Sequence, residues 1–198
     1  MHDTSSTRYD STRQAWETIW DQASVEVELQ TMNYARAQDT LNRYAAYLSK
    51  DGVILEAGSG LSAAVITLRQ RGYNVIGLDY AENALHLSHR YDASLPLTAG
   101  DVHALPFAAN ALDAYLSFGV LEHFEQGMGA ALAEAYRVLK PGGVLVLTIP
   151  YPNVVHRLIQ WRRGGRLNNE DFYESTYTRR TLCDNATAAG FSVVEAVP

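Results

Sequence analysis

The sequence predicts an α/β fold: a doubly wound, mostly parallel sheet with helices on both faces. Two observations support this prediction. Short and almost wholly apolar segments alternate along the chain with amphipathic helical segments, a pattern typical of parallel strands that are covered on both sides. Several apolar segments also end at a glycine or an acidic residue, as expected where the carboxyl ends of parallel strands border a ligand site.

The composition limits the class of protein. The chain has 198 residues, of which 47% are hydrophobic and 19% charged, which suits one globular domain with a sizeable core. Its net charge of -6 weighs against nucleic acid as a partner. Cys183 is the single cysteine, so we expect neither an internal disulfide nor a bound metal. The sequence resembles neither a signal peptide nor a membrane span, and we expect a cytoplasmic protein.

The predicted elements follow one another in a simple order. The predicted strands are 53–57, 74–78, 97–100, 112–118, 144–149 and 191–197, and the predicted core helices are 61–71, 81–91, 127–139 and 178–190. We expect one structural domain, with a helical cap of two pieces over 1–50 and a core over 51–198. An insert over 151–177 leaves the carboxyl end of the fifth strand, so it should overhang the ligand site.

A glycine turn opens the predicted ligand site. Gly58-Ser59-Gly60-Leu61-Ser62-Ala63 lies between a strand and a helix, where glycines let a ligand approach the main chain. Asp79 ends the next strand, and a carboxylate there can accept both hydroxyls of a ribose. The turn and the carboxylate predict a nucleoside site, but they do not select the cofactor.

Five sequence blocks indicate which cofactor the site binds. They are LEAGSG (55–60), GLDYA (77–81), GDVHALPF (100–107), LDAYLSFGVLEHF (112–124) and RVLKPGGVLVLTIP (137–150). In order and spacing they resemble the class I S-adenosylmethionine-dependent methyltransferase family. The resemblance implies a Rossmann-like sheet, S-adenosylmethionine as the cofactor and S-adenosylhomocysteine as its product.

The resemblance also implies roles at the methionine end of the cofactor. Gly58 and Gly60 would pass under the methionine part, and Glu56, two places before Gly58, would order that loop. The main chain of Phe118, at the end of the fourth strand, would border the same part.

Four further residues would hold the nucleoside. The resemblance implies that Asp79 binds the ribose and that Tyr80 packs against the adenine. Asp101 would accept the adenine amino group, and the amide of Val102 would read a ring nitrogen. The alternative for Asp79 and Asp101 is that they are ordinary caps at strand ends.

His123 is the candidate catalytic residue. It follows the fourth predicted strand closely, which places it at the carboxyl rim of the sheet, and a neutral imidazole could take a proton from the methyl acceptor. The alternative is that His123 only caps or packs beside the strand. We do not expect Glu122 to pair with it, because adjacent side chains on a helix diverge.

Aromatic and basic residues of the cap and the insert are candidates for the acceptor site. They are Trp20, Tyr34, Tyr151, His156, Arg157 and Tyr173. Arginine side chains suit a carboxylate or phosphate, which would make the acceptor anionic. The alternatives are a cap that packs passively on the domain and a solvated basic face on the insert.

The sequence therefore predicts methyl transfer from S-adenosylmethionine to an oxygen or nitrogen of a small-molecule acceptor. Two other readings stay open: a nicotinamide-dependent oxidoreductase, and a non-catalytic binding domain on the same fold. The family sheet has a seventh, antiparallel strand between the fifth and sixth, and no residues follow 191–197 to build it. We therefore expect the sixth strand to pair with the fifth, to pair with another chain or to be poorly ordered.

Overall fold

The computed structural model describes the backbone of residues 4–150 and 173–197, with side chains from residue 12 onward. The predicted doubly wound α/β sheet is confirmed. In this part of the chain the strands form one sheet in the order β3-β2-β1-β4-β5, and neighbouring strands are parallel. They are β1 (Val53–Ala57), β2 (Asn74–Asp79), β3 (Leu97–Ala99), β4 (Leu112–Phe118) and β5 (Leu139–Thr148).

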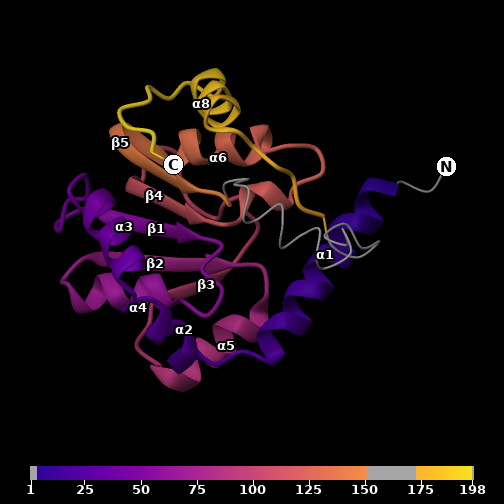
Figure 1. The fold of residues 1–198 in the computed structure, drawn as a ribbon, viewed down its shortest axis with the longest axis vertical. Helices are drawn as coiled ribbons and strands as arrows, with labels where there is room; N and C mark the ends of the chain where they lie inside the picture. The colour runs from indigo at the N-terminus through magenta and orange to yellow at the C-terminus, as the bar shows by residue number, and fades with distance from the viewer. Residues whose placement is uncertain (1–3, 151–172, 198) are drawn as a thin grey trace.

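Helices lie on both faces of this sheet (Figure 1). One face packs against α3 (Ala35–Ala45) and α4 (Ala63–Gln70), and the other packs against α6 (Gly129–Val138). Two more helices complete the layers: α5 (Glu82–Tyr91) contacts β2 and β3, and α8 (Arg179–Ala188) lies beside α6.

Side chains of the central strands alternate between these two faces, as the period of a strand requires. Leu55 of β1 lies opposite Tyr115 of β4, and both are buried in the core under α6. Ile54 lies opposite Ala114, and both are buried in the core under α3 and α4. Because both faces are covered, the strands are apolar almost throughout. Truncating a buried leucine such as Leu55 to alanine would cost about 2–5 kcal/mol.

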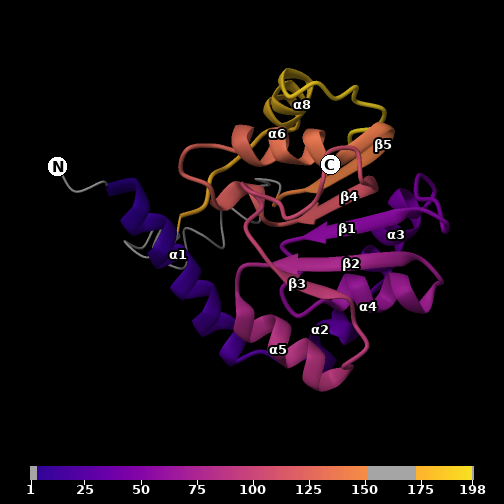
Figure 2. The same cartoon turned by 180° about the vertical axis from the view of Figure 1, so that it is seen from behind.

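The N-terminal cap consists of three helices instead of the two expected pieces. α1 (Thr4–Asp21) is separated from α2 (Val25–Thr31) by a break, and α3 follows. Ser24 explains the break, because its hydroxyl caps the N-terminus of α2. Val25 and neighbouring side chains pack on α4 and α5. The arrowheads of β1 and β2 point towards α1 (Figure 2), so α1 crosses the carboxyl side of the sheet.

The sixth strand expected at 191–197 is not formed. These residues have no helix or strand, and Glu195 is held by Arg43 of α3 and by Tyr47. These contacts fasten the segment to α3 and not to a hydrogen-bond ladder on β5. Within the described residues β5 is therefore an edge of the sheet. Of the expected insert, 151–172 lie outside the described residues, and 173–177 have no regular structure.

Candidate functional site

The glycine turn lies where the sequence predicts it, between β1 and α4 at the carboxyl edge of the sheet. Gly58 has a φ of +81° and Gly60 a φ of +48°, in the left-handed region that glycine tolerates best. The amides of Gly58 and Ser59 both donate to the carbonyl of Leu78, at 2.8 and 2.9 Å. A Cβ on Gly58 would lie 2.3 Å from Val120 Cγ2. The turn is thus tied to β2 and packed too closely for a side chain.

Asp79 joins the glycine turn to the helix that follows β2. Its Oδ2 accepts from the Gly60 amide at 2.7 Å and its Oδ1 from the Ala81 amide at 2.8 Å. The residue is only 5% exposed. Burial raises the pKa of Asp79, and the backbone N–H groups of Ala81, Gly60 and Tyr80 oppose that rise. Each carboxylate oxygen has a second lone pair, so Asp79 can still accept ribose hydroxyls.

Glu56 places a buried carboxyl group on β1, two residues before the turn. It is 4% exposed, and its Oε2 has no hydrogen-bond partner among the described residues. Burial raises the pKa of Glu56 to about 8; the Val65 backbone N–H opposes this rise and the charge of Asp79 adds to it. An unpaired buried acceptor is costly, and an N–H or ammonium donor would satisfy it. The carboxyl group and the glycine turn therefore fit the amino-acid part of S-adenosylmethionine.

Asp101 lies in the turn after β3, beside a residue that the sequence analysis missed. Its Oδ1 accepts from the His103 amide at 2.8 Å and lies 2.8 Å from His103 Nδ1. His103 in turn packs edge-on against Phe124, with ring centroids 4.3 Å apart. The neighbouring Val102 is buried. The spacing of Asp101 and His103 is the available sequence signal, since an aspartate commonly bonds the backbone two residues on.

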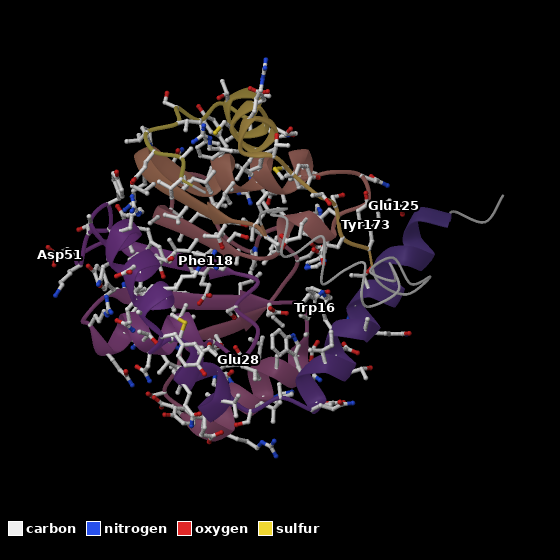
Figure 3. All side chains as sticks on the ribbon, in the orientation of Figure 1. Trp16, Glu28, Asp51, Phe118, Glu125 and Tyr173 are labelled. Carbon is white, nitrogen blue, oxygen red and sulfur yellow. The ribbon has the colours of Figure 1, made fainter. Side chains whose placement is uncertain are left out.

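Phe118 ends β4 and points its ring away from the turn. The ring packs on Tyr44 of α3, with centroids 5.2 Å apart, and Figure 3 shows Phe118 well separated from Trp16. Only its main chain and Gly119, with a φ of +68°, lie at the rim of the sheet. The main-chain role that the resemblance implies for Phe118 stays a prediction.

His123 lies in the short helix η1 (Leu121–His123) after β4. Its Nδ1 is 2.9 Å from the carbonyl oxygen of Tyr173, and its ring meets Trp16 edge-on at 5.2 Å. Because a carbonyl can only accept, Nδ1 carries a proton, and in the neutral ring Nε2 has the lone pair. Burial lowers the pKa of His123, while the bond to Tyr173 and the charge of Glu174 oppose that shift.

The expectation that Glu122 diverges from His123 is wrong. Glu122 Oε1 lies 4.0 Å from His123 Nε2. The reason is local: η1 is a single 3-10 turn, and Phe124 after it is extended, so no continuous helix separates the two side chains. Glu122 is 1% exposed, and burial raises its pKa to about 7, opposed by a backbone N–H and helped by the charge of Glu174.

Two of the acceptor-site candidates lie near this histidine. Tyr173 presents its carbonyl to His123. In Figure 3 the labelled residues Tyr173 and Trp16 both lie towards α1, on the carboxyl side of the sheet. Trp20 stacks on Trp16, with ring centroids 5.4 Å apart. A Cβ on Gly60 would lie 2.7 Å from Trp20 Cζ2. Trp20 therefore covers the glycine turn.

The other acceptor candidates are not brought to this place. Tyr34 directly precedes α3 and is 67% exposed. Tyr151, His156 and Arg157 lie outside the described residues.

A cavity of about 1070 Å³ runs along the outer edge of β5, which the sequence analysis also missed. It reaches Gly119 at the rim of the sheet, and its border includes Arg36, Arg43 and Lys140. No group of three or more metal-binding side chains occurs in the described part of the chain. No helix among the described residues is long and apolar enough to cross a membrane.

Comparison with known proteins agrees with this geometry. A family model described as a methyltransferase domain matches residues 55–147. A probable S-adenosylmethionine-dependent methyltransferase of Mycolicibacterium smegmatis is 33% identical over 141 residues, which cover 71% of this chain and 52% of that protein. Demethylmenaquinone methyltransferase of Streptomyces avermitilis is 36% identical over 95 residues, covering 48% and 40%. The chain thus spans about half the length of these curated relatives.

Solved structures share the fold at low identity. A chain in the complex of the Haloferax volcanii Trm112 methyltransferase activator with a methyltransferase superposes with a TM-score of 0.72 at 19% identity, covering 93% of this chain and 76% of that one. A methyltransferase of Archaeoglobus fulgidus gives a TM-score of 0.65 at 18% identity, covering 78% and 67%. With its sequence blocks, its glycine turn and the match over residues 55–147, the chain carries a methyltransferase domain of the class I S-adenosylmethionine-dependent family.

Proposed function

We propose that this protein transfers a methyl group from S-adenosylmethionine to an oxygen or nitrogen of a small-molecule acceptor. One observation carries the proposal: a continuous series of contacts joins the glycine turn to His123. Trp20 packs on Gly60 and stacks on Trp16, and Trp16 meets the ring of His123. The candidate base is thus linked through two indole rings to the loop that would hold the methionine part of the cofactor.

The residues of the site have separable tasks. When bound, the cofactor supplies an activated methyl group on its sulfonium, so the protein mainly has to position the acceptor. Glu56, Gly58 and Gly60 would bind the amino-acid part, and Asp79 would bind the ribose. Trp20 would shield the reacting end from water, and His123 Nε2 would take the acceptor's proton.

The names of relatives and the shape of the β5 cavity support a small acceptor. Relatives include demethylmenaquinone methyltransferases and a malonyl-[acyl-carrier protein] O-methyltransferase of Serratia marcescens. The cavity is bordered by apolar side chains of β5 and by Arg36. Two other basic side chains at its border are already paired, Arg43 with Glu195 and Lys140 with Asp113. The apolar lining suits an acceptor with an apolar part.

The cofactor is tested by calorimetric titration with S-adenosylhomocysteine and, separately, with NAD. We expect S-adenosylhomocysteine to bind and NAD to give no heat. Binding of NAD alone would identify an oxidoreductase, and binding of neither would identify a domain that uses the fold without this chemistry.

The base is tested by His123→Ala, with transfer of labelled methyl groups to a panel of quinols, phenols and carboxylic acids as the readout. We expect turnover to fall about a hundredfold, with the affinity for S-adenosylhomocysteine unchanged. His86→Ala, on the exposed side of α5, is the control and should retain full activity. A His123→Ala protein within threefold of the wild type at every pH would remove His123 from the mechanism.

A further inference from the structure

Glu122 is a buried acid that the proposed reaction has not yet used. Only 1% of it is exposed, and its Oε2 has no hydrogen-bond partner among the described residues. Its Oε1 lies 4.0 Å from His123 Nε2, and the side chain of His123 is itself 10% exposed. Two ionisable groups this close in a poorly solvated place cannot titrate independently.

The segment after the insert holds this pair in place. The Tyr173 carbonyl accepts from His123 Nδ1 at 2.9 Å, and the Ser175 amide donates to the Glu122 carbonyl at 2.7 Å. The Tyr173 contact fixes the tautomer, so that Nε2 of the neutral ring faces the carboxyl group. Gly119 passes close beside the carboxyl group, since a Cβ there would lie in ordinary contact with Glu122 Oε1, at 3.5 Å.

We propose that Glu122 is a positioning residue that acts through His123, and that the two ionisable side chains are electrostatically coupled across 4.0 Å, so that they titrate as a pair. This inference rests on the proposed function only for its catalytic consequence. In the anionic form of the pair, the carboxylate faces a neutral imidazole. With S-adenosylmethionine bound, the cofactor would supply the methyl group and leave as S-adenosylhomocysteine, and the O–H or N–H bond of the acceptor would break as its bond to the methyl carbon forms. The proton moves to His123 Nε2, and the carboxylate of Glu122 balances the imidazolium charge.

The surroundings favour this arrangement over an isolated base. Burial disfavours a lone imidazolium at His123 and a lone carboxylate at Glu122: it lowers the pKa of His123 and raises the pKa of Glu122 to about 7. Glu174 is the other charged group that acts on both members, and its negative charge favours a proton on the pair. Trp16 forms the apolar wall next to the imidazole. The two groups therefore titrate as a pair.

The test is the titration of His123 followed by NMR in the free protein, with ¹⁵N-labelled histidine and His123→Asn to assign the signal. In the wild type we expect a titration in two steps and, in the neutral ring, a protonated Nδ1. Glu122→Gln should give a single step at lower pH, because the opposing charge is gone. Glu174→Gln is the matched control: it removes a nearby carboxylate that lies outside the pair, and should keep two steps.

Kinetics supplies the second readout. Glu122→Gln should lower kcat about tenfold, leave the affinity for S-adenosylhomocysteine unchanged, and move the acidic limb of the pH–rate profile to lower pH. Glu122→Asp should recover part of both changes. A His123 titration that is the same in the wild type and in both Glu122 variants would overturn the proposal. The NMR titration needs no acceptor, so the two proposals can fail separately. Coupled titration of Glu122 and His123 in a protein that transfers no methyl group would refute the proposed function and still support the coupling.

Discussion

At the scale of single residues, Asp79 stabilises the folded backbone in addition to its predicted role in binding the cofactor. Asp79 satisfies the amides of Gly60 and Ala81, and would also accept ribose hydroxyls. Removing it therefore disturbs the empty protein as well as the cofactor.

Two substitutions at Asp79 separate these duties. Asp79→Asn keeps one carbonyl acceptor, whereas Asp79→Ala leaves two buried amides unpaired, at about 1–3 kcal/mol each. We expect both variants to bind S-adenosylhomocysteine at least tenfold more weakly, and Asp79→Ala to lose more free energy of unfolding than Asp79→Asn, which leaves one amide unpaired instead of two. Calorimetry and chemical denaturation measure the two effects. Unchanged affinity in Asp79→Asn would exclude Asp79 from the ribose site.

Glu56 makes stability depend on pH. Its folded-state pKa of about 8 lies above the ordinary value of 4.5, so the folded state holds this proton more tightly than the unfolded state does. The resulting stabilisation is complete below about pH 4.5 and is lost as the pH rises through 8. Glu56→Gln carries no such proton. We expect thermal unfolding to show the wild type losing stability relative to Glu56→Gln between pH 5 and 8. A stability difference between the two proteins that stays constant over this range would contradict the raised pKa of Glu56.

At the scale of elements, α1 is fastened to the core at two places along its C-terminal half. Asn83 at the start of α5 donates to the Glu17 carbonyl at 2.7 Å and to Asp21 Oδ1 at 2.8 Å. Trp20 packs on Gly60 of the glycine turn. α1 is therefore joined both to the start of α5 and to the glycine turn, and these two segments lie at the candidate cofactor site.

Trp20→Ala should loosen α1 and weaken cofactor binding together. Losing this packing should speed amide exchange in the peptide covering α1 and lower the affinity for S-adenosylhomocysteine several-fold, because the glycine turn loses its cover. Ile19→Ala changes an exposed side chain on the same helix and should alter neither. If both variants match the wild type in amide exchange of α1 and in affinity for S-adenosylhomocysteine, then α1 packs passively on the domain and is not part of the site.

At the scale of the whole molecule, the sheet is protected on one side more than on the other. β1 and β4 have a strand on each side, whereas the outer edge of β5 borders the cavity and residues 191–197 form no ladder with it. Amide exchange should therefore be slowest in β1 and β4, faster in β5, and nearly unprotected in 191–197. Equal protection of β4 and β5 would show that something covers this edge, and loss of that protection on dilution would identify a second copy of the chain.

Local chemistry was sufficient to predict the five strands that form, the glycine turn and the position of Asp79. Each depends on neighbours in the chain: a short apolar run, a backbone conformation that favours glycine, or a polar residue at the end of a strand. The same regularity places Gly58, Asp79 and Asp101 at one edge, because parallel strands end together. Sequence reasoning therefore identified the cofactor class and predicted the edge of the sheet at which the candidate residues meet.

What lies around those residues depends on groups far apart in the chain. Trp20 reaches Gly60, the Tyr173 carbonyl reaches His123, and Glu195 reaches Arg43. The last contact bears on the strand that was predicted at 191–197 and is not formed. The apolar alternation of this segment suits a strand, but its Glu195 is hydrogen-bonded to Arg43 of α3. Likewise, a sequence neighbour such as Glu122 becomes a partner of His123 only through the backbone turn after β4. The sequence pattern predicts the local conformation that each residue favours. The burial of a side chain, its protonation state and its hydrogen-bond partners depend on the distant residues that pack against it.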